Sequence, residues 1–134
     1  MPSGNHGDRA AAALVKPRTA VQFDTAWRRL GGRAARAKYL GLLRESDYPV
    51  VFKHTLEPRT FGEIVETLGG LEDAAEAARH LSGLARVPRI SAIVMFMEDG
   101  EREAIGRILE AAAAARSPSV EEKVLRSVRK TFSV

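Results

Sequence analysis

The side chains that could do chemistry in this chain of 134 residues are scattered along it rather than grouped. Its three histidines are His6, His54 and His80, and none stands at metal-ligand spacing from a second histidine or a carboxylate. We interpret His54 and His80 as ordinary surface or boundary residues. The chain has no cysteine, which excludes disulfides and thiolate metal sites. We therefore expect neither a metal nor a cofactor.

Carboxylates and glycines, the other residues of many active sites, lie where they serve helix ends. The acidic residues within 72–76 and 98–103 open predicted helices, where the helix dipole favours negative charge. The pairs Gly31-Gly32 and Gly69-Gly70 lack the strand and lysine of a phosphate-binding loop, and we interpret them as helix stops. No serine lies in a nucleophile-elbow pattern. We predict that the protein is not an enzyme.

A basic cluster near the N-terminus is the first feature that could bind a partner. Its cations could contact a phosphate backbone, but the aromatic residues beside it, Trp27 and Tyr39, belong to the apolar stripes of helices. A solvated face is the favoured interpretation, and a basic helical nucleic-acid-binding module is kept as the alternative function. The cluster comprises Arg28, Arg29, Arg33, Arg36 and Lys38.

The uncharged segment from Ile90 to Met97 is the second such feature. It is too short to span a membrane, which takes about 20 apolar residues. A buried strand would have no second strand to pair with, so a helix opened by Pro88 is favoured. A helix would carry two stripes, where a surface helix needs one. The first stripe comprises Ile90, Ile93, Val94 and Met97, and the second Arg89, Ala92 and Phe96.

Three environments could cover this second stripe. Spacing alone favours a wholly internal helix. The alternatives are a docking surface with Arg89 and Phe96 as anchors, and a face buried between two copies of this chain.

The elements that must position these residues are predicted to be seven or eight short helices. Apolar residues recur at i, i+3, i+4 and i+7 along the chain, as in Phe61, Ile64, Val65 and Leu68, and period-two alternation is absent. The last helix is predicted from a capping box, Ser119 with Glu122, followed by an apolar stripe within 120–128. The fold class is therefore all-α, as a compact bundle or a short solenoid.

Composition and charge place these helices in one domain. Residues 1–19 are expected to be a flexible tail and residues 20–134 the helical domain, with 45% hydrophobic residues for a single core. The net charge of +4 is divided into +6 over 1–53, −5 over 54–110 and +3 over 111–134. Because the middle of the chain is acidic, a sustained nucleic-acid-binding face is not indicated.

The order and spacing of these residues resemble the C-terminal domain of RNA polymerase II-associated protein 3, which also occurs in sperm-associated and dynein-arm assembly factors. The resemblance runs from Val21 to Ala112, and its most specific part lies between Leu81 and Leu109. Family members tend to have an aromatic residue where this chain has Ile90, and a larger apolar residue where it has Ala92. The matching residues are Phe23-x-x-x-Trp27-Arg28-x-Leu30, Phe52, Leu56-Glu57-Pro58, Phe61, Ile64, Leu68, Leu81-x-x-Leu84 and Arg89-x-x-x-x-Val94-Met95-Phe96-Met97.

The resemblance implies a non-enzymatic docking domain of a co-chaperone adaptor. Its partners would be a ring of RuvB-like AAA+ ATPases, a Monad-like WD-repeat protein and, indirectly, the ninety-kilodalton heat-shock chaperone, with no membrane partner. Its role would be to support chaperone-dependent assembly of complexes such as axonemal dynein. We expect a cytoplasmic protein with a nuclear or ciliary pool. The resemblance assigns partner contacts to Arg89, Ala92 and Phe96.

Overall fold

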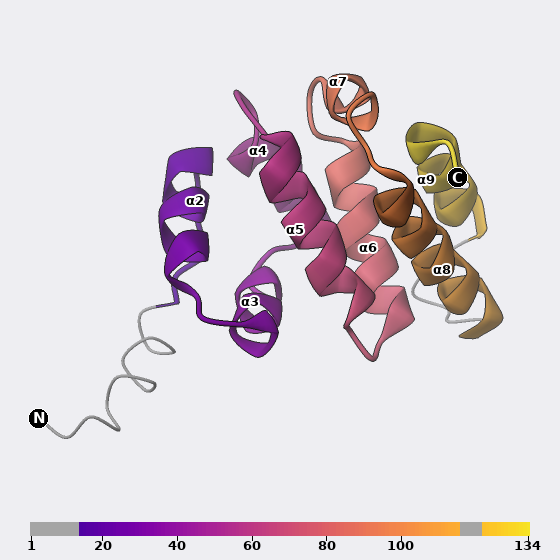
Figure 1. Cartoon of the computed structure of the whole chain (residues 1–134), viewed down its shortest axis with the longest axis horizontal. Helices are drawn as coiled ribbons and strands as arrows, with labels where there is room; N and C mark the ends of the chain where they lie inside the picture. The colour runs from indigo at the N-terminus through magenta and orange to yellow at the C-terminus, as the bar shows by residue number, and fades with distance from the viewer. Residues whose placement is uncertain (1–13, 116–121) are drawn as a thin grey trace, which may run out of the picture.

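The computed structural model describes residues 14–115 and 122–134, and within these ranges every regular element is a helix (Figure 1). The all-α fold class predicted from the sequence is confirmed. None of the described helices is both long enough and apolar enough to span a membrane. The helices are α2 (Ala20–Arg29), α3 (Arg33–Leu40), the 3₁₀ helix η1 (Glu45–Asp47), α4 (Tyr48–Val51), α5 (Pro58–Gly69), α6 (Ala74–Ala85), α7 (Ile90–Val94), α8 (Asp99–Ala115) and α9 (Glu122–Phe132).

Helix α6 is the centre of the bundle. It packs against η1 and α4 on one side and against α5, α8 and α9 on the others. Its small residues, such as Ala75, Ala77 and Ala78, are buried and let these neighbours approach closely. Helices α2 and α3 lie at one end of the molecule and α9 at the other, and α7 projects from the edge between them (Figure 1).

An aromatic cluster joins the N-terminal helices to the rest of the core. The ring of Phe23 lies 5.1 Å from Trp27, 5.5 Å from Tyr39 and 5.0 Å from Phe52, measured between centroids. All four side chains are buried, so they hold α2, α3 and the end of α4 together.

Packing begins before the first helix. Leu14 contacts the core, Pro17 is buried, and the Lys16 ammonium lies 2.7 Å from an Asp47 carboxylate oxygen. Residues 1–13 of the predicted tail lie outside the described residues, and the domain boundary at residue 19 stays a prediction.

The C-terminal helix closes the other end of the core. Phe132 of α9 is fully buried and its ring lies 5.8 Å from that of Phe61 in α5. The guanidinium of Arg102 in α8 donates to the Phe132 carbonyl oxygen at 3.2 Å, which satisfies a terminal carbonyl of α9. The predicted capping serine, Ser119, and Val120 lie outside the described residues.

Two details predicted from the sequence are wrong. The sixth predicted helix, expected to include Arg89 and reach Met97, is one turn long, Ile90–Val94. His80, expected at the surface or its boundary, is 5% exposed because η1 and α4 fold over that face of α6.

Candidate functional site

Helix α7 is a single turn that an unusual backbone conformation sets up. After α6 ends, Arg89 adopts φ 65° and ψ 23°, the left-handed region that costs a non-glycine residue about 1 kcal/mol or more. The turn then closes with bonds such as Met95 N–H to the Ser91 carbonyl at 3.2 Å and Phe96 N–H to Ile93 at 2.9 Å. Ile93 is buried and fixes the turn to the core.

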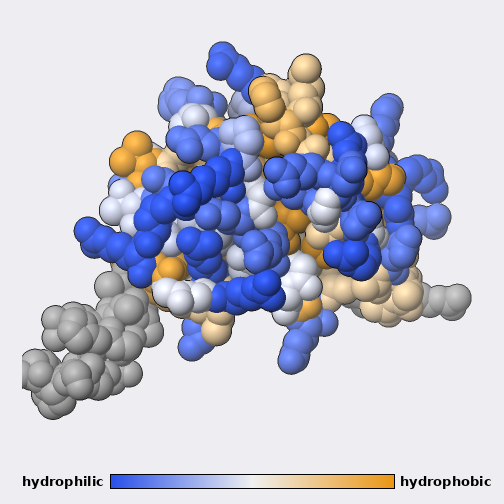
Figure 2. All heavy atoms as spheres, in the orientation of Figure 1, coloured by the Kyte–Doolittle hydropathy of each residue, from blue (hydrophilic) through white to orange (hydrophobic). Residues whose placement is uncertain are grey.

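Beyond α2, the most exposed large apolar side chains that the structure describes lie at the end of this turn. Met95 is 82% exposed and Phe96 is 68% exposed, and Arg89 and Ala92 are exposed beside them in sequence. Figure 2 shows the corresponding group of hydrophobic atoms projecting above the charged surface, over α7. We name the four residues Arg89, Ala92, Met95 and Phe96 the α7 tip.

The structure tests both predicted stripes. In the first stripe, Ile93 is buried and Ile90, Val94 and Met97 are only partly buried, so the prediction of a wholly internal helix is wrong. The three residues predicted for partner contact, Arg89, Ala92 and Phe96, are all exposed, and their role in binding stays a prediction.

The positions of Arg89 and Phe96 are not explained by helical spacing. Arg89 precedes the helix and Phe96 follows its C-cap, Met95, so the i, i+7 relation does not describe them. Met95 belonged to neither predicted stripe. The run of three large apolar residues from Met95 to Met97, directly before the acidic residues that open α8, was the signal that could have identified it.

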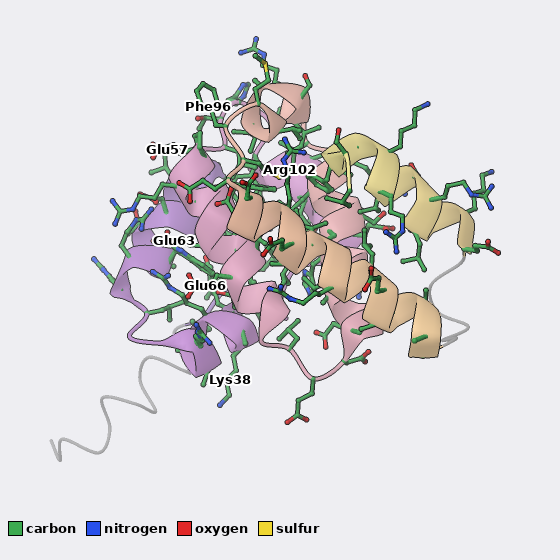
Figure 3. All side chains as sticks on the ribbon, turned by 45° about the vertical axis from the view of Figure 1, so that its right-hand side comes forward. Lys38, Glu57, Glu63, Glu66, Phe96 and Arg102 are labelled. Carbon is green, nitrogen blue, oxygen red and sulfur yellow. The ribbon has the colours of Figure 1, made fainter. Side chains whose placement is uncertain are left out.

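Phe96 also lines a groove of about 740 Å³ between α5 and α8. The groove is bounded by Arg59 and Glu66 of α5 and by Glu98 and Arg107 on the α8 side. In Figure 3, Phe96 lies near the start of α5, and Glu63 and Glu66 follow along that helix. The α7 tip and this groove are therefore neighbouring surfaces.

The basic cluster predicted as an alternative site is largely paired with α5. Arg28 donates to both carboxylate oxygens of Glu63, at 2.8 and 3.1 Å, and Arg33 donates to Glu66 at 3.0 Å. Arg36 lies 4.4 Å from the centre of the Trp27 ring, and 3.9 Å from Glu63.

These pairs reduce the charge available to a phosphate backbone. Among the described residues, Arg29 and Lys38 are the members of the cluster without an ion pair in the structure. The geometry therefore gives the nucleic-acid alternative little support.

His80 and Tyr48 form a buried polar pair that sequence analysis missed. The Tyr48 hydroxyl lies 2.6 Å from His80 Nδ1, and Glu76 lies 3.8 Å from Nε2. Burial lowers the pKa of His80 and raises that of Tyr48. Because Tyr48 is fully buried, its hydroxyl is out of reach of a substrate, and the pair serves packing.

Two of the carboxylates predicted at helix starts accept backbone hydrogen bonds there. Asp73 accepts from the backbone N–H groups of Ala75 at 3.0 Å and Glu76 at 3.2 Å, and so caps α6. Glu101 accepts from the Glu98 N–H at 3.0 Å at the start of α8. Over residues 14–115 and 122–134, no three histidine or acidic side chains gather as metal ligands would.

Comparison with known proteins agrees with the all-helical fold. The chain resembles the NMR structure of the C-terminal domain of the human RPAP3 protein with a TM-score of 0.74, at 21% identity and over 87% of each chain, which shows the fold. No curated protein matches the chain. The family described as the potential Monad-binding region of RPAP3 matches residues 16–102, from the segment before α2 to the first turn of α8. The chain therefore belongs to the family of the RPAP3 C-terminal domain, a family of protein-interaction domains.

Proposed function

We propose that this protein is a docking module of a co-chaperone adaptor, and that the α7 tip is its docking surface. The observation that carries the proposal is the exposure of Met95 and Phe96 on a turn held in place by buried Ile93. Large apolar side chains so exposed mark interaction sites on soluble domains when they gather in one patch. A preformed turn also reduces the ordering cost of binding.

The residue types of the tip suit a protein partner. Phe96 and Met95 can enter apolar pockets, and the Arg89 guanidinium can pair with a carboxylate at the rim. Ala92 leaves room for the partner between them. Such a site buries a few anchors surrounded by polar contacts, which is the usual anatomy of a specific interface.

The proposed partners are a ring of RuvB-like AAA+ ATPases and a Monad-like WD-repeat protein. Support for a partner of the Monad type comes from the family, whose description is a potential Monad-binding region. The RuvB-like ring and an indirect link to the ninety-kilodalton heat-shock chaperone follow from the resemblance of residues 21–112 to the same family. We propose a role in assembling protein complexes such as axonemal dynein, in the cytoplasm with a nuclear or ciliary pool.

Binding of purified variants to the RuvB-like ring and, separately, to a Monad-like protein tests the proposal. We expect Arg89→Ala and Phe96→Ala each to weaken binding by about tenfold, the loss of one hot-spot anchor. Val50→Ala is the matched control, because Val50 is 63% exposed and lies on α4. Circular dichroism verifies that each variant is folded. Undiminished binding of both tip variants would refute the assigned surface.

Sedimentation of the isolated chain addresses the dimer alternative. If the α7 tip is buried between two copies, Phe96→Ala converts a dimer into a monomer. A wild-type monomer at the concentrations used for binding supports docking to another protein.

A further inference from the structure

The groove between α5 and α8 has a floor of small residues. Gly62 and Gly69 of α5 and Ala104 of α8 line it, and Val65 lies beneath them, almost fully buried. Figure 2 looks onto this side of the molecule, where pale and hydrophobic atoms between α5 and α8 lie between charged margins. A second hollow of about 250 Å³ shares Gly69 and Ala104 and extends the groove along α8. Small residues therefore make up much of the floor.

At the centre of this floor, the Glu101 carboxylate lies over Gly62. A Cβ atom added at Gly62 would collide with the Glu101 carboxylate, the side chain that caps the start of α8. The glycine thus lets α5 and α8 approach closely, because the Glu101 carboxylate lies in the space that a Cβ atom would take.

The charges along the groove are polarised. Arg33 pairs with Glu66 at 3.0 Å and Arg59 lies 3.7 Å from Glu63, so the α5 margin is largely neutralised. On the α8 side, an acidic end and a basic end remain. Glu98 and Glu101 lie at the Phe96 end, and Arg107 lies toward the other. In the part of the chain that the structure describes, neither Glu98 nor Arg107 has a side-chain partner in the structure.

We propose that this groove binds an extended peptide segment of a protein partner, with a basic residue at the Phe96 end and a carboxylate at Arg107. An apolar side chain beside the basic residue would pack on Phe96, and small residues would pass over Gly69 and Ala104. The opposite charges at the two ends of the groove favour a peptide, because an extended peptide can present opposite charges at a fixed separation with apolar side chains between them.

The structure also sets the spacing of these two charges. Nine residues separate Glu98 from Arg107, which is roughly 13 Å along a helix with a rise of about 1.5 Å per residue. An extended chain advances about 3.3 Å per residue. The basic residue and the carboxylate of the peptide should therefore stand about four residues apart.

A titration of ¹⁵N-labelled protein with a defined peptide tests this inference. The probe is acetyl-Ser-Lys-Leu-Ala-Ser-Glu-Ser-amide, in which lysine and glutamate stand four apart. Two control peptides replace the glutamate by lysine or the lysine by glutamate. We expect the probe to shift the amide signals of Gly62, Gly69 and Ala104 with millimolar affinity, and each control to bind at least about fivefold more weakly.

A charge-reversal variant makes the test specific. Arg107→Glu should weaken the probe at least about fivefold and make the doubly basic peptide the better ligand, whereas Lys130→Glu on α9 should do neither. Equal binding of the probe by Arg107→Glu and wild type would overturn the proposal. So would shifts confined to other surfaces, shifts produced by self-association, or no shift at about 10 mM peptide.

The groove shares Phe96 with the α7 tip, but each proposal is tested by a residue that belongs to one surface alone. Arg89→Ala should weaken binding to the RuvB-like ring and leave the peptide affinity unchanged, while Arg107→Glu should change only the peptide affinity. Failure of one inference is therefore distinguishable from failure of the other.

Discussion

Replacing Glu63 tests whether the N-terminal helices are held to α5 by one partly buried acceptor. Glu63 Oε1 accepts from the indole N–H of Trp27 at 3.2 Å, and both carboxylate oxygens accept from Arg28. The carboxylate also lies within 4 Å of the guanidinium groups of Arg36 and Arg59. Glu63→Ala would remove the acceptor and leave these donors behind.

The expected cost follows from the burial of each donor. The Trp27 side chain is fully buried, and an unsatisfied buried N–H group costs about 1–3 kcal/mol. The Arg28 pair is partly exposed, with 31% and 23% of the two side chains accessible, so it adds at most about 1 kcal/mol. We expect Glu63→Ala to lower the free energy of unfolding by about 2–3 kcal/mol.

Urea unfolding followed by circular dichroism measures this change, with Glu63→Gln as the matched control. Glutamine keeps a carbonyl acceptor for Trp27 and loses only the ion pairs, so it should cost about 1 kcal/mol or less. High salt should remove that smaller cost, because it screens exposed pairs. The reasoning is refuted if the two variants are equally destabilised, or if Glu63→Ala changes stability by less than about 0.5 kcal/mol.

Three further predictions concern particular backbone and buried positions. Because burial lowers the pKa of His80, the histidine binds a proton more readily in the unfolded chain than in the folded one. The free energy of unfolding should therefore fall as the pH falls below about 6.5, by up to about 1.4 kcal/mol per pH unit. Urea unfolding between pH 7 and 5 should show this slope, and the same slope in His80→Gln would contradict the assignment. A Cβ atom at position 83 would lie 2.5 Å from Tyr48 Cδ2, so Gly83→Ala should destabilise the fold by about 1–3 kcal/mol. Gly106 has open space around it, so Gly106→Ala should stabilise the fold by about 0.5–1 kcal/mol. Thermal melts in which the melting temperatures of both variants shift in the same direction would refute the packing argument. At the left-handed position 89, Arg89→Gly should be about 1 kcal/mol more stable than Arg89→Ala in urea unfolding, and equal stabilities would show that the position carries no strain.

Helical periodicity predicted the elements that bury one face. Phe61, Ile64 and Leu68 were predicted to face the core of one helix, and all three are buried in α5. Such a pattern is local, so the sequence of one element suffices to read it. The exposure of Phe96 was not predicted by spacing, which favoured a wholly internal helix for its segment.

The misplaced residues depend on contacts between elements. His80 is buried because Gly83, one turn later in α6, admits the Tyr48 ring, and neither residue signals the contact in sequence. The length of α7 depends on the conformation of Arg89 and on the chain turning back toward α8. Periodicity therefore predicted that Ile93 faces the core, but it overstated the length of the helix and did not identify the exposed tip. The α5–α8 groove likewise exists only once two helices pack.

Isothermal titration of the wild-type chain and of Phe96→Ala with the RuvB-like ring tests the docking proposal most directly. The account predicts that the wild-type chain binds, that Phe96→Ala binds about tenfold more weakly, and that Val50→Ala binds as the wild type does. Equal affinities of the wild-type chain and folded Phe96→Ala would contradict the assignment of the α7 tip as the docking surface.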